Sequence, residues 1–106
     1  MHDVHWSASE KRLARAVFEQ ALAQELAEIL AEFKTRATRA TNAEEMWLIR
    51  DYLEQAQREI QRKYDFRYSQ LLVVFGLLLR EGRIAGGQLV GLSEEKLGFI
   101  HRVASL

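Results

Sequence analysis

The chain has 106 residues and a mass of 12.3 kDa, enough for one domain. Apolar residues make up 48% of it, which indicates a folded chain, and its formal net charge of +0 removes any general attraction to nucleic acid or anionic lipid. Cysteine is absent, which excludes disulfides and thiolate metal sites. No signal-peptide core opens the sequence, and its longest apolar run, Leu71–Leu79, is too short to cross a bilayer, so we expect a cytoplasmic protein.

The positions of the backbone-breaking residues predict long helices in the first part of the chain. Proline is absent, and all six glycines lie at or after Gly76. Residues 1–75 therefore lack strong turn signals, which is typical of helices and not of β-hairpins. Ser7 and Glu10 have the spacing of a capping box, so the first helix is predicted to begin there and to run to about Arg39.

A second helix is predicted over Glu44–Arg67, after a capping-box pattern at Thr41 and Glu44. On a helical wheel of about 100° per residue, its apolar residues form one stripe. Trp47 lies outside this stripe among charged residues, where a large aromatic side chain usually needs a surface to cover it. That surface is either a recognition partner or a neighbouring helix of the same or another subunit. The stripe consists of Met46, Ile49, Leu53, Ala56, Ile60 and Tyr64.

The remaining residues predict a smaller helical head. The run Leu71–Leu79 is apolar all round, and its flanks favour a third helix over Asp65–Glu81 that ends at a glycine cap. Gly82–Leu92 is glycine-rich and is predicted to hold a short helical turn. Ser93 then has the position of a cap for a last helix, Glu94–Ser105.

The lengths of the first two helices predict self-association. They would measure about 45 and 30 Å, which is long for a chain whose radius of gyration should be about 13 Å if it were globular. We therefore predict one all-α domain, with a long-helix body at about residues 7–64, a head at about 65–106, and a two-fold homodimer. The candidates for its core or dimer interface are Leu22, Leu26, Ile29, Phe33, Ile49, Leu53 and Ile60.

The chain resembles the fluorescence recovery protein family of cyanobacteria over nearly its whole length. The likeness rests on W-x3-D-[FY]-L from Trp47 to Leu53, E-I at Glu59–Ile60, K-Y-D-x-R at Lys63–Arg67 and LL-x-EG at Leu78–Gly82. This resemblance implies a homodimer with a long-helix body and a helical head at each end. It also implies a non-enzymatic regulator, without cofactor or metal. Such a protein binds the C-terminal domain of the photoactivated orange carotenoid protein, speeds its return to the resting state and ends the quenching of phycobilisomes.

The resemblance further implies a functional patch on the second helix, where Trp47 and Asp51 match the family. Arg50 stands where a histidine is expected, and Gln57 stands where an arginine is expected. The family's aromatic and lysine in the head fall at Val73 and at about Phe99, so neither is kept. These departures leave open a helical dimer with a different protein partner, in an organism without phycobilisomes. The expected partner-binding residues are Trp47, Arg50, Asp51, Glu54, Gln57 and Arg58.

Other sequence signals favour weaker alternatives. Ile84–Ile100 loosely resembles a helix-turn-helix, but its second helix would begin with Glu94 and Glu95, which is unfavourable beside phosphates, so DNA binding ranks third. His2, Asp3 and His5 are too few for a metal site. No pair of carboxylates lies in an evident pocket, so acid–base catalysis has no support.

Overall fold

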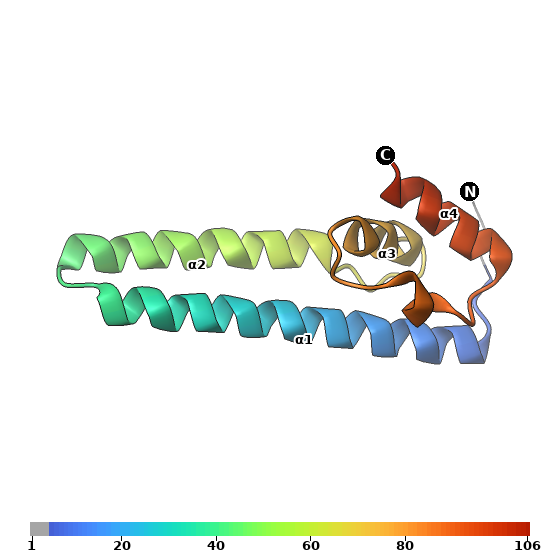
Figure 1. Cartoon of the computed structure of the whole chain (residues 1–106), viewed down its shortest axis with the longest axis horizontal. Helices are drawn as coiled ribbons and strands as arrows, with labels where there is room; N and C mark the ends of the chain where they lie inside the picture. Colours follow the sequence, from blue (N-terminus) through green and yellow to red (C-terminus); the bar gives the residue numbers. More distant parts are fainter. Residues whose placement is uncertain (1–4) are drawn as a thin grey trace. The chain divides into compact units, whose positions relative to one another are not determined.

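The computed structural model describes residues 5–106, and within these residues it contains helices and no strand (Figure 1). This confirms the predicted all-α fold. No helix in the described part of the chain is both long and apolar enough to cross a membrane. The elements in chain order are the α-helices α1 (Ala8–Arg39), α2 (Ala43–Lys63) and α3 (Leu71–Arg80), the short 3-10 helix η1 (Gly86–Leu89), and the α-helix α4 (Glu94–Ala104).

The chain forms two compact units, and helix α1 contributes to both of them. The first unit contains the residues up to Ala21 together with Tyr64–Leu106, and the second contains Leu22–Lys63. The first turns of α1 thus cluster with the C-terminal helices. The sequence instead assigns residues 7–21 to the long-helix body, so the compact units divide the chain at a different place.

The first unit holds the apolar core. Most residues of α3 are buried, and α3 packs against α4. Phe75, Leu71 and Leu78 are completely buried at its centre. This explains why Leu71–Leu79 is apolar all round instead of amphipathic. The other buried apolar residues are Trp6, Ala14, Val17, Phe18, Ala21, Leu72, Val74, Ile84, Leu89, Leu92 and Ile100.

The junction between α2 and α3 corrects two predicted boundaries. Helix α2 ends at Lys63 instead of Arg67, and α3 begins at Leu71 instead of Asp65. The rings of Tyr64 and Phe66 make edge-to-face contacts with Phe18, at centroid distances of 5.5 and 4.9 Å. Residues only two apart do not face the same side of a helix, so these contacts require a non-helical backbone. Tertiary packing therefore overrides the local helical pattern.

The helix ends are set by local hydrogen bonds. At the start of α1, Ser7 Oγ accepts from Glu10 N at 3.1 Å, and Glu10 Oε1 accepts from Ser7 N at 3.0 Å, which confirms the predicted capping box. At α2 the cap is Asn42 and not Thr41, since Asn42 Oδ1 accepts from Glu45 N at 2.8 Å. The predicted cap at Ser93 is confirmed, because its side chain accepts from Lys96 N. Helix α3 ends in a Schellman motif at Gly82, whose φ of 75° suits glycine.

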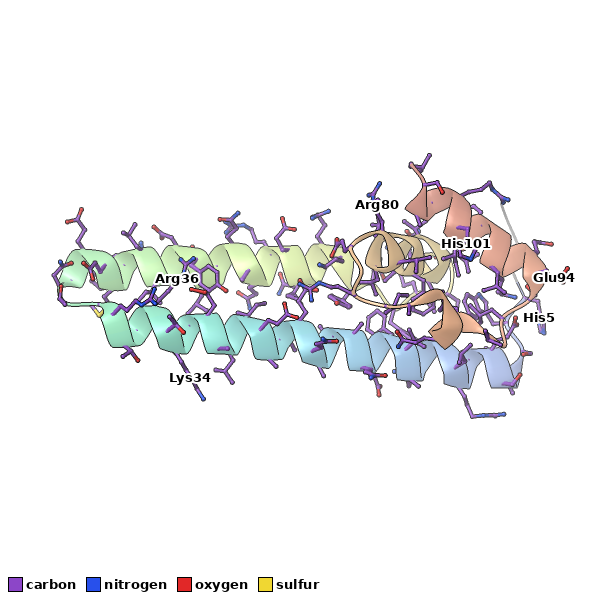
Figure 2. The ribbon with its side chains drawn as sticks, in the orientation of Figure 1. His5, Lys34, Arg36, Arg80, Glu94 and His101 are labelled. Atoms are coloured by element: carbon purple, nitrogen blue, oxygen red, sulfur yellow. The ribbon has the colours of Figure 1, made fainter. Side chains whose placement is uncertain are left out.

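The second unit is a helical hairpin without a buried apolar residue. Its two arms are joined by polar contacts. Lys63 Nζ lies 2.9 Å from Glu25 Oε2, and both side chains are largely buried. Figure 2 shows Arg36 reaching from α1 toward α2, where its guanidinium lies 4.0 Å from the centre of the Tyr52 ring. The hairpin therefore leaves most of its apolar side chains accessible.

Candidate partner-binding site

Trp47 is an exposed aromatic residue on α2, with 52% of its surface accessible. Its neighbours are charged: the Arg50 guanidinium lies 5.4 Å from the centre of the indole ring, and Arg50 Nη2 lies 3.2 Å from Asp51 Oδ1. The predicted position of Trp47 outside the apolar stripe is thus confirmed. Trp47, Arg50 and Asp51 form what we call the tryptophan patch. All three side chains are open to solvent, so the ion pair adds little stability to the chain.

An open apolar groove of about 740 Å³ runs along the hairpin. No residue that lines it is buried in the single chain. The apolar stripe from Met46 to Ile60 therefore faces an open groove and is not core, whereas its last member, Tyr64, packs on Phe18 in the first unit. Six of the seven residues predicted for the core or interface line this groove, and Leu22 does not. The six residues are Leu26, Ile29, Phe33, Ile49, Leu53 and Ile60.

The groove and the expected partner site overlap in part. Arg50, Glu54 and Gln57 also line the groove. Trp47, Asp51 and Arg58 lie outside it. The structure therefore places the tryptophan patch beside the groove, with Arg50 common to both. A surface that covers the groove would border the patch.

Leu48 is a site candidate that the sequence reasoning missed. It is 60% exposed and lines a smaller hollow with Arg36 and Arg39. The available signal was its position directly after Trp47, because it also lies off the apolar stripe. Together with Trp47 it extends the exposed apolar surface of α2, and contiguous apolar surface is typical of contact sites.

The two head positions that depart from the family pattern lie on different helices of the first unit. Val73 is exposed on α3, whereas Phe99 is half-buried on α4. The Arg102 guanidinium lies 5.7 Å from the centre of the Phe99 ring. A cation and an aromatic ring therefore occur together on α4, although in a different arrangement from the expected one.

The geometry offers no metal-binding arrangement within residues 5–106, since no group of three potential ligands is close enough together there. The candidate ligands His2 and Asp3 lie outside the described residues.

Comparison with known proteins decides the family. The model of a family described as photoprotection regulator fluorescence recovery protein matches residues 6–104. The chain belongs to the fluorescence recovery protein family. It is 35% identical to the fluorescence recovery protein of Synechocystis sp. over 101 residues, which cover 95% of this chain and 93% of that protein.

Solved structures of fluorescence recovery proteins have the same fold. The structure of the Synechocystis sp. PCC 6803 protein matches with a TM-score of 0.91 at 34% identity, and that of the Fremyella diplosiphon protein with 0.91 at 29%. Each match covers 96% of this chain and 100% of the other chain. The resemblance that the sequence motifs indicate is confirmed, and photoprotection is the process to which the family belongs.

Proposed function

We propose that this chain is a non-enzymatic cytoplasmic regulator that binds the photoactivated orange carotenoid protein through that partner's C-terminal domain. Binding accelerates return of the partner to its resting orange state and so ends quenching of phycobilisomes. Membership of the fluorescence recovery protein family supports the process. The observation that carries the proposal to a site is the exposed Trp47, flanked by Arg50 and Asp51 on α2.

The tryptophan patch has the composition of a protein-binding hot spot. Tryptophan and arginine are the residue types that most often contribute strongly to association, when a partner desolvates them. Arg50 keeps guanidinium N–H groups available for an acidic group of the partner, because its contact with Asp51 uses one edge only. We expect the partner surface to supply an apolar pocket for Trp47 and a carboxylate for Arg50.

The proposal includes a homodimer in which a second copy covers the groove. In a single chain, an apolar groove of about 740 Å³ lined by Leu26, Phe33 and Leu53 would remain in water. In a two-fold dimer, the hairpin of the second copy presents the same apolar surface, so packing the two hairpins together would remove both apolar surfaces from water. Arg50, Glu54 and Gln57 would then lie at the edge of the dimer contact, beside the partner site.

Acceleration imposes an energetic condition on this binding. A protein that bound only the activated partner would stabilise that state and slow its decay. The regulator must therefore bind the transition state of the return reaction more tightly than the activated state. A surface patch that engages one domain of the partner while the partner's other contacts re-form would meet this condition.

The test is dark recovery of orange carotenoid protein absorbance after strong blue light, with and without equimolar protein. We expect acceleration by the parent chain and its loss with Trp47→Ala, at a cost of about 2 kcal/mol or more of binding energy. Leu30→Ala is the matched control, since Leu30 is equally exposed at 52% but lines neither the groove nor the patch. Circular dichroism should show unchanged helicity in both variants.

The departures at Arg50 and Gln57 give the same assay a second arm. Arg50→His with Gln57→Arg restores the pattern that the resemblance implies, and we expect the restored variant to accelerate recovery more than the parent. No acceleration by either protein would contradict the proposal. That result would favour the alternative, a helical dimer of this family with a different protein partner.

A further inference from the structure

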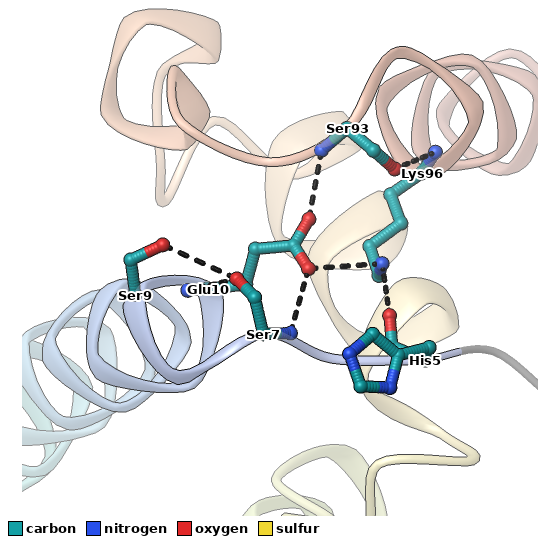
Figure 3. A network of polar contacts seen from close by, with 6 residues as sticks. All are labelled: His5, Ser7, Ser9, Glu10, Ser93 and Lys96. Atoms are coloured by element: carbon teal, nitrogen blue, oxygen red, sulfur yellow. Dashed lines mark hydrogen bonds and ion pairs between the residues drawn. The ribbon is translucent and has the colours of Figure 1, made fainter.

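One buried carboxylate in the first unit joins the segment before α1 to the start of α4 (Figure 3). Glu10 Oε1 accepts from Ser7 N at 3.0 Å and from Lys96 Nζ at 3.1 Å, and Glu10 Oε2 accepts from Ser93 N at 2.9 Å. Lys96 Nζ also donates to His5 O at 2.5 Å. The start of α4 and the segment of residues 5–7 that precedes α1 are therefore held by the same pair of charges.

Both charges are almost completely removed from water, since Glu10 is 8% exposed and Lys96 is 5% exposed. A buried ion pair loses two hydration shells when it forms, so its net contribution is small compared with that of an apolar contact of the same size. Removing one partner alone is strongly unfavourable, because the other charge stays buried. Such a pair fixes one arrangement of its segments, and it regains hydration if the segments separate.

Trp6 lies beside this pair, and its own indole N–H is buried without a hydrogen-bond acceptor within residues 5–106. It is 5% exposed, and its ring lies 5.1 Å from Lys96 Nζ and 5.6 Å from the Tyr68 ring. Among the residues that the structure describes, none accepts a hydrogen bond from Trp6 Nε1. A buried donor without an acceptor is unfavourable, and exposure to water would satisfy it. Separating residues 5–7 from the start of α4 would thus let the Trp6 N–H donate to water, in addition to hydrating the charges of Glu10 and Lys96.

We propose that Glu10 and Lys96 form a latch that closes residues 5–7 over the start of α4 and controls whether Trp6 is buried or accessible. In the closed state Trp6 is covered, as observed. In the open state the indole is exposed with its N–H free to donate, while the apolar core around Phe75 and Leu78 still holds α3 and α4 together. A partner that binds the indole would select the open state. The latch does not depend on the proposed function.

Hydrogen–deuterium exchange of the full chain tests the latch through Glu10→Gln, which removes the charge and preserves the side-chain shape. We expect exchange in residues 5–12 and 93–97 to accelerate at least about tenfold, with Leu71–Leu79 unchanged. Glu10→Gln with Lys96→Met removes both charges and should recover part of the protection. Glu19→Gln is the control on the same helix, because its pair with Arg15 is exposed.

The fluorescence of Trp6 gives a second readout, in a Trp47→Phe background so that only one tryptophan remains. Acrylamide quenching should increase with Glu10→Gln and stay at the parent value with Glu19→Gln. The parent chain supplies a readout even if a variant does not fold. In low urea its residues 5–12 should exchange by local opening, whereas Leu71–Leu79 should exchange only with global unfolding. Equal protection of both segments in the parent, or unchanged quenching in a folded Glu10→Gln variant, would overturn the proposal.

Discussion

Glu10 and Glu25 are buried on α1, and each is matched by a lysine from a distant part of the sequence. Lys96 reaches Glu10 from α4 within the first unit, and Lys63 reaches Glu25 from α2 within the second. The pattern of polar and apolar residues along a helix does not distinguish such glutamates from exposed ones, because a buried glutamate and an exposed glutamate are the same polar residue in that pattern. Their role depends on a contact that is long-range in sequence.

The buried state of Glu10 predicts a pH dependence of stability. Burial alone would raise the pKa of Glu10, but hydrogen bonds from Ser7 N and Ser93 N and the charge of Lys96 outweigh it, so its pKa is lowered in the folded protein. The contribution of Glu10 is therefore present above its unfolded pKa and is lost as the pH falls through the lowered folded value. Within residues 5–106, His5 also contacts this network, and it does so through its backbone carbonyl oxygen.

Urea unfolding of the parent and Glu10→Gln at several pH values checks this sign. We expect the parent to have the higher free energy of unfolding at about pH 7 and the difference to shrink as the pH falls through the lowered pKa of Glu10, where its carboxylate takes up a proton. Glu19→Gln should follow the parent at each pH, because its ion pair is exposed. A difference that stays constant down to the acid limit would show that the charge of Glu10 is not responsible.

At the scale of the elements, α3 and α4 approach closely at Gly76. A Cβ built there would lie 2.5 Å from Val103 Cβ and 3.1 Å from Ile100 O. The first atom is attached directly to the backbone of α4 and cannot rotate away. An alanine at this position therefore requires the helices to move apart, even though alanine is a better helix former than glycine.

We predict that Gly76→Ala lowers the free energy of unfolding by about 1–3 kcal/mol. Thermal unfolding followed by circular dichroism measures the effect. Gly86→Ala is the control, since no atom lies within 4 Å of a Cβ at that position, and it should stay within about 0.5 kcal/mol of the parent. Val103→Ala removes Cγ1, which also lies 2.5 Å from the built Cβ, but keeps the Val103 Cβ, so it should recover only a small part of the loss in the Gly76→Ala background. A stabilising Gly76→Ala would contradict the close approach of the two helices.

The sequence predicts those element boundaries that depend on local chemistry. The start of α1 and the start of α4 follow from Ser7 and Ser93, whose side-chain hydroxyl oxygens each accept a hydrogen bond from the backbone N–H three residues along the chain. The end of α2 was not predictable in the same way. It depends on Phe18, which lies more than forty residues before the rings of Tyr64 and Phe66 that pack on it.

The candidate site was predictable in part for a similar reason. The helical wheel identifies Trp47 as exposed, because that property depends only on its own helix. It does not reveal that the stripe containing Ile49 and Leu53 is accessible in one chain, since a core stripe and an interface stripe have the same pattern. Only the absence of a buried apolar residue in the second unit separates the two cases.

At the scale of the whole molecule, the two units have different sources of stability. The first unit has a core of completely buried side chains, among them Phe75 and Ile100. The second has an open groove and a partly buried ion pair, which together are insufficient for an independent helical hairpin. We therefore expect the stability of the second unit to depend on association, and that of the first unit to be largely independent of it.

Leu53→Asp separates these contributions, because Leu53 lines the groove and lies outside the core of the first unit. Light scattering should give the parent at micromolar concentration a mass of about twice the 12.3 kDa of one chain. For the variant we expect the mass of one chain, since a carboxylate in an apolar contact should weaken association by at least about 100-fold. Exchange protection should fall in the second unit, whereas Leu71–Leu79 should stay protected.

Leu30→Asp, outside the groove, should remain a dimer. A parent that is monomeric and fully helical would contradict the dimer, and a dimeric Leu53→Asp variant would place the interface elsewhere.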